Sequence, residues 1–219
     1  MKKTLIVFLL AAICTLTASA EFSMAFGLKG GISLNHMWGD DWDSEVNSVN
    51  GDNKMRLGFS VGGFAALNIM KNLAIQPEVY LSLIGGGYDY INTDTYEIRK
   101  RLWVVEIPIL AKLTLPAGKF KGSLFAGGDI MIKVFDYQSV TEGPGGEEEE
   151  PVDDIYFKRP YFGLVTGIEL GIPMSGKITF LVDVRYTVMF SDIFDDTFES
   201  NPEYKSNSLK FMVGIGTGL

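Results

Sequence analysis

Cysteine is almost absent from this sequence: Cys14 is the single one, and it lies within the first twenty residues. Those residues, MKKTLIVFLLAAICTLTASA, begin with Lys2 and Lys3, continue with an apolar core and end in small residues. This arrangement is typical of a secretory signal peptide. We therefore predict a cleaved signal peptide over residues 1–20 and an exported domain over residues 21–219. Without Cys14 the exported domain has no thiol, which excludes disulfides and thiolate chemistry.

Long apolar runs and basic residues are also scarce. After residue 20 no apolar run approaches the 18 residues that a transmembrane helix needs, so a membrane span would have to be built of strands. The sequence has 19 bases against 27 acids, and removal of Lys2 and Lys3 takes the net charge from −8 to −10. An acidic protein of this kind is a poor match for nucleic acid, which needs a basic surface.

What the sequence does contain is strict alternation of apolar and polar residues. In the stretch WVVEIPILAKLTL, residues 103–115, every odd position is apolar, while Glu106 and Lys112 occupy even positions. Side chains alternate between the two faces of a strand, so this stretch is predicted to be a β-strand. The pattern suits a soluble sheet with its apolar face inward. It equally suits a membrane barrel with its apolar face on lipid and its charges in the lumen.

Eight segments show this alternation, and most are long. They cover residues 26–36, 56–68, 73–83, 103–115, 120–134, 161–172, 178–188 and 209–219. Strands of soluble sheets usually have about five or six residues, whereas a tilted strand that crosses a bilayer needs about 9–11. The lengths therefore favour a membrane barrel.

The connections between these segments alternate in length. Three are short, and the other four are long, polar and rich in acids, over residues 38–55, 88–97, 136–157 and 191–206. Short turns at one end and long loops at the other are typical of outer-membrane barrels. We predict an all-β fold: an eight-stranded antiparallel up-and-down transmembrane β-barrel. The alternative is a soluble, lipocalin-like secreted barrel with its apolar faces inward.

Two prolines interrupt the pattern, since Pro77 and Pro108 lie in the middle of predicted strands. A proline lacks the N–H group that a sheet ladder uses. A β-bulge at each proline would accommodate it.

The same prolines lie in short motifs that resemble a known family. Residues 75–79, IQPEV, and 106–112, EIPILAK, resemble the QPEL and LEIPxLxK signatures of the outer-membrane β-barrel (PorT-like) family of Bacteroidetes-type bacteria. Lys29-Gly30-Gly31, FGLV at 162–165 and DVRY at 183–186 are similar to further blocks of that family. The resemblance covers the whole exported domain. It implies an outer-membrane barrel that is inserted by the barrel-assembly machinery, has no cofactor and usually has no assigned enzymatic activity.

The predicted lumen carries charges of both signs. Twelve residues share the inward face: Lys29, Arg56, Glu78, Glu106, Lys112, Lys121, Asp129, Lys133, Glu169, Asp183, Arg185 and Lys210. A barrel of eight strands is only wide enough for side chains to fill, so we expect these charges to pair as a plug. Glu106 and Lys112 lie roughly 20 Å apart along one strand, so each needs a partner on another strand. A narrow conducting pore is the alternative.

The outward face predicts where the bilayer ends. Its aromatic residues should form two girdles, with Trp103, Phe162 and Phe190 at the outer interface and Phe26, Phe120 and Phe180 at the inner one. Three bases, Arg99, Arg101 and Lys158, lie just beyond the outer girdle. We expect them either to anchor the interface or to bind phosphates of lipopolysaccharide.

Signals for catalysis and metal binding are weak. The only histidine, His36, is near Ser33, Asp40 and Asp41 in the sequence, but we interpret it as a polar rim residue rather than a catalytic one. The spacing Asp41-x-Asp43-x-Glu45 is a fragment of a calcium loop. The acids at 147–150 with Asp153 and Asp154 are expected to be a solvated surface. No catalytic, cofactor or metal site is therefore predicted.

We expect a structural or surface-interaction protein of the outer membrane, in contact with lipid, lipopolysaccharide and an unidentified extracellular ligand. A narrow channel and a lipid-modifying enzyme are the alternatives.

Overall fold

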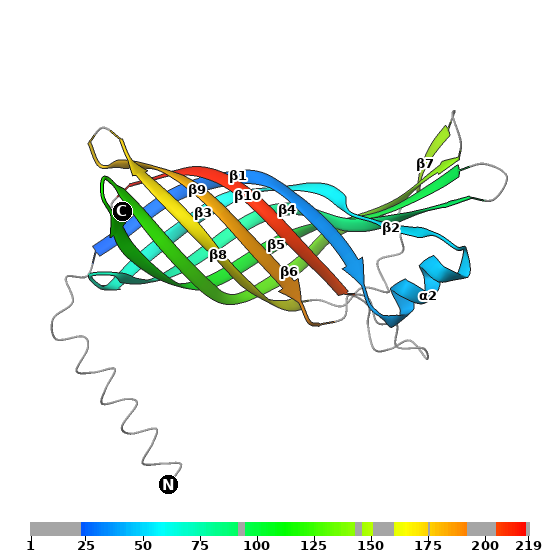
Figure 1. Ribbon diagram of the computed structural model, residues 1–219, viewed down its shortest axis with the longest axis horizontal. Coiled ribbons are helices and arrows are strands. Elements are labelled where there is room, and N and C mark those ends of the chain that lie inside the picture. The colour runs from blue at the N-terminus through cyan, green and yellow to red at the C-terminus, as the bar shows by residue number, and fades with distance from the viewer. Residues whose placement is uncertain are drawn as a thin grey trace, which may run out of the picture.

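The computed structural model is a closed, tilted β-barrel with extensions at one end (Figure 1). It describes residues 23–91, 95–142, 146–150, 160–174, 176–191 and 205–217, apart from the side chains of residues 91, 95–96 and 135–150. The predicted signal peptide, residues 1–20, lies outside this part of the chain.

Eight long strands form the ring, and each pairs antiparallel with the next one. In chain order they are β1 (Ser23–Trp38), β3 (Arg56–Met70), β4 (Leu73–Ile91), β5 (Thr95–Ala117), β6 (Phe120–Glu142), β8 (Tyr161–Pro173), β9 (Ile178–Met189) and β10 (Lys205–Thr217). The ring closes where β1 pairs with β10, from Phe26 opposite Thr217 to Trp38 opposite Lys205. The predicted eight-stranded antiparallel up-and-down barrel is confirmed.

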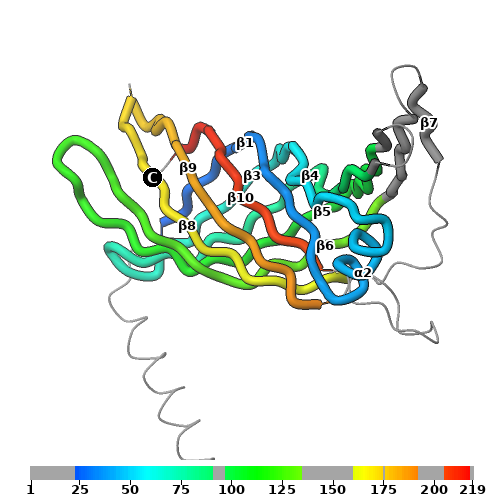
Figure 2. Tube along the Cα trace, turned by 45° about the vertical axis from the view of Figure 1, so that its right-hand side comes forward, coloured from blue at the N-terminus to red at the C-terminus, as the bar shows by residue number. Residues whose placement is uncertain are grey.

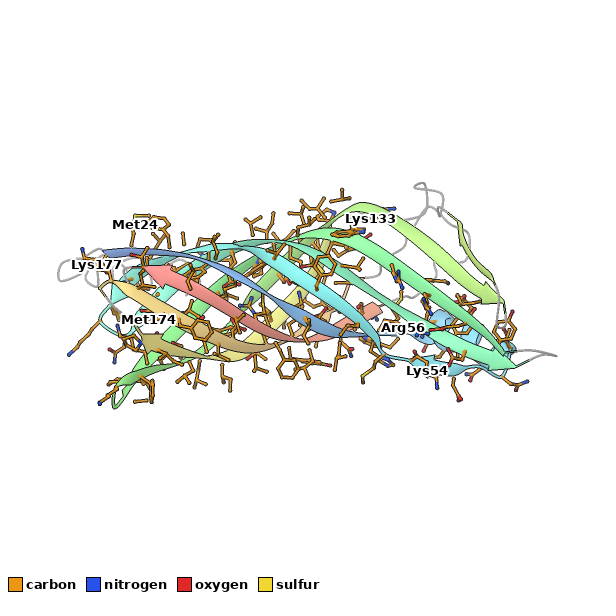
Figure 3. The ribbon with its side chains drawn as sticks, turned by 90° about the horizontal axis from the view of Figure 1, so that it is seen from above. Met24, Lys54, Arg56, Lys133, Met174 and Lys177 are labelled. Carbon is orange, nitrogen blue, oxygen red and sulfur yellow. The ribbon has the colours of Figure 1, made fainter. Side chains whose placement is uncertain are left out.

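The barrel is apolar outside and charged inside. Leu28 and Leu164 are 65% and 60% exposed, whereas Lys29 and Asp183, on the inner face, are 2% and 0% exposed. Every strand of the ring exposes large apolar side chains of this kind, which Figure 3 shows pointing away from the barrel. So large an apolar surface needs lipid around it. The lipocalin-like alternative, with apolar faces inward, is therefore wrong.

The six girdle aromatics all point away from the lumen. Phe26, Phe120, Phe162 and Phe190 are exposed, and Trp103 and Phe180 are half-exposed on the same outer surface. The register predicted for these strands is thus confirmed.

Tight turns join the strands at one end, which we call the turn end. They include residues 71–72, 118–119 and 176–177. Gly118 and Gly176 adopt φ of 67° and 70°, a left-handed conformation that tight hairpins require and glycine adopts without strain. Met24, Met174 and Lys177 lie at this end, and Lys54 and Arg56 at the opposite, loop end (Figure 3). In outer-membrane barrels the turn end faces the periplasm.

The loop end is more ordered than the sequence predicts. Residues 38–55 were expected to be a loop, but they contain helix α2 (Asp40–Ser48) and strand β2 (Asp52–Lys54). Residues 88–91 and 95–97 continue β4 and β5 as a sheet beyond the barrel (Figures 1 and 2). The end of β6 pairs with β5 there, and β7 (Gly146–Glu150) pairs with β6 (Figure 1). The described residues contain no helix that could span a membrane.

The prolines are accommodated without bulges. On the two sides of Pro77 the pairing of β3 with β4 keeps one register, from Phe64 opposite Glu78 to Leu67 opposite Ile75. The pairing of β4 with β5 likewise resumes in register past Pro108. The register shifts lie elsewhere, at Asn68/Met70 and Trp103/Val104. Each proline therefore leaves a short gap in the ladder, and neither is accommodated by a bulge.

Candidate functional site

The lumen contains a buried network of ion pairs centred on Arg185 of β9. Its Nη1 lies 2.5 Å from Oε2 of Glu78, on β4 at the opposite side of the ring, and its Nε donates to Oδ1 of Asp183 at 2.9 Å. The guanidinium also lies 5.4 Å and 5.1 Å from the ring centres of Tyr80 and Phe125. A planar guanidinium suits this position because it can bond two carboxylates in its plane and stack on rings.

Two lysines extend this network across the lumen. Lys29 Nζ, on β1, lies 2.8 Å from Oδ2 of Asp183 and 2.6 Å from Oε2 of Glu169 on β8. Lys112 Nζ, on β5, lies 2.5 Å from Oε1 of Glu169 and also donates to Gln76. All these side chains are at most 5% exposed. The charges meet at hydrogen-bond distance, as buried charges must.

A separate pair lies nearer the loop end, where Lys210 of β10 donates to both carboxylate oxygens of Glu106 on β5. These strands are also opposite each other in the ring. The sequence predicted that Glu106 and Lys112 need partners on other strands, and the structure provides Lys210 and Glu169. Neither partner is on a strand adjacent to β5.

Apolar clusters lie on both sides of the charged layer. At the turn end Phe64 and Leu181 pack with Ala25, Ala66 and Ala74. At the loop end a larger cluster contains Met37, Trp42, Val46, Ile84, Tyr88, Leu102, Val104, Met131, Tyr161 and Met189. The lumen is therefore filled in layers along its length.

Helix α2 closes the outer mouth of the lumen. Its Trp42 and Val46 are 0% and 5% exposed within the loop-end cluster. On the same helix Glu45 accepts hydrogen bonds from Lys100 Nζ of β5 at 2.7 Å and from the Tyr88 hydroxyl at 3.0 Å. Lys100 Nζ also lies 5.3 Å from a ring centre of Trp42. Apolar contact and an ion pair together hold α2 in the mouth.

Four of the predicted lumen charges are not part of the ion pairs described above. Two of them lie outside the enclosed lumen, and two are buried in it. Arg56 lies at the loop end, half-buried, and pairs with Glu97 and Asp89. Lys121 has the inward parity but is exposed at the turn end, and it joins none of the described ion pairs. The predicted placement of Arg56 and Lys121 in the lumen network is wrong, because the apolar and polar alternation of the sequence continues beyond the enclosed part of each strand. Lys133 is buried and makes a further contact, while Asp129 is buried without a hydrogen-bond partner among the described residues.

The extension beyond the barrel carries a second, more open group of charges. Glu97 of β5 accepts bonds from Arg56 and from Arg99, whose Nη2 lies 2.8 Å from Oε2. The hydrogen bond from Arg99, with the charges of Arg56 and Arg99, lowers the pKa of Glu97 to about 2. Arg99 and Arg101 are both half-exposed on the outer side, while Lys158 lies outside the described residues.

The weak catalytic and metal candidates do not assemble. Ser33 is 1% exposed on the inner face and His36 has the outward parity, so the two point to opposite sides of β1. Asp41, Asp43 and Glu45 form part of α2 rather than a calcium loop. The described residues contain no group of three or more metal-ligating side chains.

The closed antiparallel ring, the apolar outer surface, the enclosed charges and the short turns at one end define a membrane-spanning barrel of the bacterial outer-membrane class. Residues 19–195 match the outer membrane protein beta-barrel domain family, and the chain belongs to this family. It is thus a protein of the bacterial outer membrane.

Solved structures of other barrels are similar at low identity, whereas no curated protein sequence matches the chain. Neisserial surface protein A is 12% identical, with a TM-score of 0.43, over 89% of this chain and 99% of that one. OprG from Pseudomonas aeruginosa is 11% identical, with a TM-score of 0.46, over 90% and 96%. Ail of Yersinia pestis is 12% identical, with a TM-score of 0.40, over 89% and 99%. At these values no ligand or activity is carried over to this protein.

Proposed function

We propose that this protein is a non-conducting barrel that serves as a structural or surface-interaction protein of the outer membrane. The observation that carries the proposal is the double closure of the lumen. Ion pairs join opposite walls inside the lumen, and α2 is packed into the mouth at the loop end. A solute crossing the barrel would have to displace both. The part of the protein left to act is its outer surface.

The sheet that rises beyond the barrel is the surface best suited to an interaction. It is formed by β4, β5, β6, β7 and β2, and it extends past α2 on the loop-end side (Figure 1). The pair Arg56–Glu97 and the neighbouring Arg99 fix charges on its base. A preformed sheet binds with little loss of conformational entropy.

Electrical recording in a planar bilayer tests the closure directly. The refolded protein should give no reproducible conductance steps. A variant that lacks residues 40–48 and carries Glu78→Ala with Arg185→Ala loses the helix in the mouth and one of the pairs that join opposite walls, and it is the matched control with a weakened closure. Defined steps from the unmodified protein would replace this proposal with a narrow channel.

A deletion strain tests the surface role. It should lose binding to host or environmental surfaces and keep normal permeability to small solutes. Restoring the barrel with residues 90–96 replaced by a two-residue turn between the paired Asp89 and Glu97 should leave binding lost, while Tyr88 and Lys100 still hold α2. If binding returns, the extension is not the interacting surface.

We also propose that Arg99 and Arg101 bind lipopolysaccharide phosphates at the rim. Guanidinium groups bind phosphate oxygens in bidentate geometry, and both side chains lie on the outer side just beyond Trp103. Purified lipopolysaccharide should raise the unfolding temperature of the protein, and less so for the Arg99→Ser, Arg101→Ser variant. Lys54→Ser, at the same end of the molecule, is the control.

The finer assignment to the PorT-like group rests on the five sequence motifs, and it is part of the proposed function.

A further inference from the structure

Asp129 of β6 is a buried acid that the ion-pair network leaves out. Its side chain points into the lumen and the residue is 1% exposed. Neither carboxylate oxygen has a hydrogen-bond partner among the described residues. A buried carboxylate without a partner is rare, since an unpaired charge in a low-dielectric interior costs several kcal/mol.

The immediate surroundings of Asp129 explain the missing partner. Its two cross-strand neighbours are Pro108 and Gly163, and the inward residues on either side of it along β6 are Gly127 and Met131. None of these four has a side chain that can donate a hydrogen bond.

The two glycines have no room for a side chain that could supply a partner. A Cβ at Gly127 would lie 2.0 Å from the carbonyl oxygen of Ile109, and one at Gly163 would lie 2.5 Å from Sδ of Met189. The absence of a partner is therefore built into the wall of the barrel.

The basic side chains of the ion-pair network are already paired with other acids. Lys29, Lys112, Arg185 and Lys210 are paired with Glu78, Glu106, Glu169 and Asp183. The charged group that acts most strongly on Asp129 is the acid Glu106, followed by Lys210, Arg185 and Glu78. Lys133 lies four residues along the same strand, so its Cα atom is roughly 13 Å from that of Asp129 at the usual rise per residue. Tyr80 and Thr187 have buried hydroxyls, but these carry no charge that could neutralise an acid.

We propose that Asp129 is a proton-binding site of the barrel lumen, whose carboxyl group stays protonated in the folded barrel at neutral pH. A proton suits this site better than a metal cation, because an alkali ion needs several oxygen ligands and the four residues that flank Asp129 in the wall offer no side-chain oxygen. In the unfolded chain the same carboxyl ionises at about pH 4. The barrel therefore takes up one proton as it folds at neutral pH.

Infrared spectroscopy of the refolded full-length barrel at pH 7 tests the proposal. The expected result is a carbonyl stretching band of a protonated carboxyl group that is lost in Asp129→Asn. The band should persist in Asp183→Asn, in which an ion-paired acid is changed. If that variant does not fold, Asp43→Asn on the exposed surface of α2 is the control. A spectrum without this band at pH 7, or a band unchanged in Asp129→Asn, would overturn the proposal.

The pH dependence of unfolding gives a second, independent readout. A protonated acid that ionises on unfolding costs the folded state stability as pH rises above about 4. Asp129→Asn removes that cost, so its unfolding temperature should equal that of the unmodified protein at pH 3.5 and exceed it at pH 8. A lower unfolding temperature of Asp129→Asn at pH 8 would show an ionised Asp129 that is balanced by Lys133 or by a bound cation. Stabilisation by NaCl but not by choline chloride, lost in the variant, would identify that cation and equally contradict the proposal.

Discussion

Glu106 and Lys210 form an ion pair across the full width of the barrel, between β5 and β10 on opposite sides of the ring. Arg185 and Glu78 join β9 and β4, which are also opposite, in the same way. The charged side chains thus act as crosslinks between opposite walls. Sheet hydrogen bonds connect only neighbouring strands, so these pairs supply contacts that the sheet itself lacks.

The Glu106–Lys210 pair gives the first prediction. Glu106→Ala should lower the free energy of unfolding by about 3–5 kcal/mol, because it leaves Lys210 as a buried, unpaired charge. The double variant Glu106→Ala, Lys210→Met should be destabilised less than the single one. The measurement is the temperature at which the folded, heat-modifiable band shifts on a gel. An unchanged temperature in Glu106→Ala would mean that water fills the lumen and that a channel has to be considered again.

Arg185 should not be replaceable by lysine. A lysine keeps the charge but cannot bond Glu78 and Asp183 in one plane or stack on Tyr80 and Phe125. We expect Arg185→Lys to cost roughly 1.5–3 kcal/mol for each charge-assisted hydrogen bond it loses, measured by urea unfolding in lipid vesicles. Lys177→Arg, in an exposed turn, is the control and should have no effect. Equal stability of Arg185→Lys would show that only the charge matters.

The attachment of α2 can be measured by cysteine labelling in protein expressed from residue 21, which contains no other cysteine. Val46→Cys should react slowly with a thiol reagent and Ser48→Cys, at an exposed position, quickly. Adding Lys100→Met removes a partly exposed ion pair worth about 0.2–1 kcal/mol, so labelling of Cys at 46 should rise only several-fold. Adding Trp42→Ala removes about 3–5 kcal/mol of packing and should raise it more than a hundredfold. Fast labelling of Val46→Cys without either change would show that α2 is not docked.

Glu97 should make the extension sensitive to acid. Its pKa of about 2 lies below the ordinary value of a glutamate, because Arg99 and Arg56 favour the carboxylate. A lowered folded-state pKa contributes stability that is complete above about pH 4.5 and is lost as pH falls toward 2. The protection factor of β5 amides near Arg99, which corrects for the intrinsic pH dependence of hydrogen exchange, should fall as pH falls over this range, and in Glu97→Gln it should be low at every pH. A protection factor that stays constant with pH in the unmodified protein would contradict this role of Glu97.

The sequence was sufficient to predict the ring and, within the enclosed part of each strand, which residues face the lumen. Alternation with a period of two assigns Glu78, Asp183 and Arg185 to the inner face without any knowledge of their partners. It could not show that Lys210 reaches Glu106, because that contact depends on the stagger of strands on opposite sides of the barrel. It also placed Arg56 and Lys121 in the lumen, since the pattern does not reveal where the enclosed part of a strand ends.

Helix α2 was missed although the sequence contained a signal for it. Trp42 and Val46 are four residues apart, as on one face of a helix, and Asp40, Asp41 and Asp43 provide acids in the first turn. The density of acids favoured interpretation as a polar loop. What decides the outcome is tertiary: the mouth of the barrel offers an apolar surface of Met37, Ile84 and Tyr88 that buries Trp42.

The pairing of β1 with β10 determines when this barrel can be completed. Until the last described strand meets the first, both carry unpaired N–H and C=O groups along one side, and such an edge recruits strands from other molecules. The two edges stay exposed until β1 pairs with β10, from Phe26 opposite Thr217 onward. A chaperone or assembly factor that dissociates before this pairing forms therefore releases a sheet that can aggregate through its edges. One that dissociates afterwards releases a closed monomer.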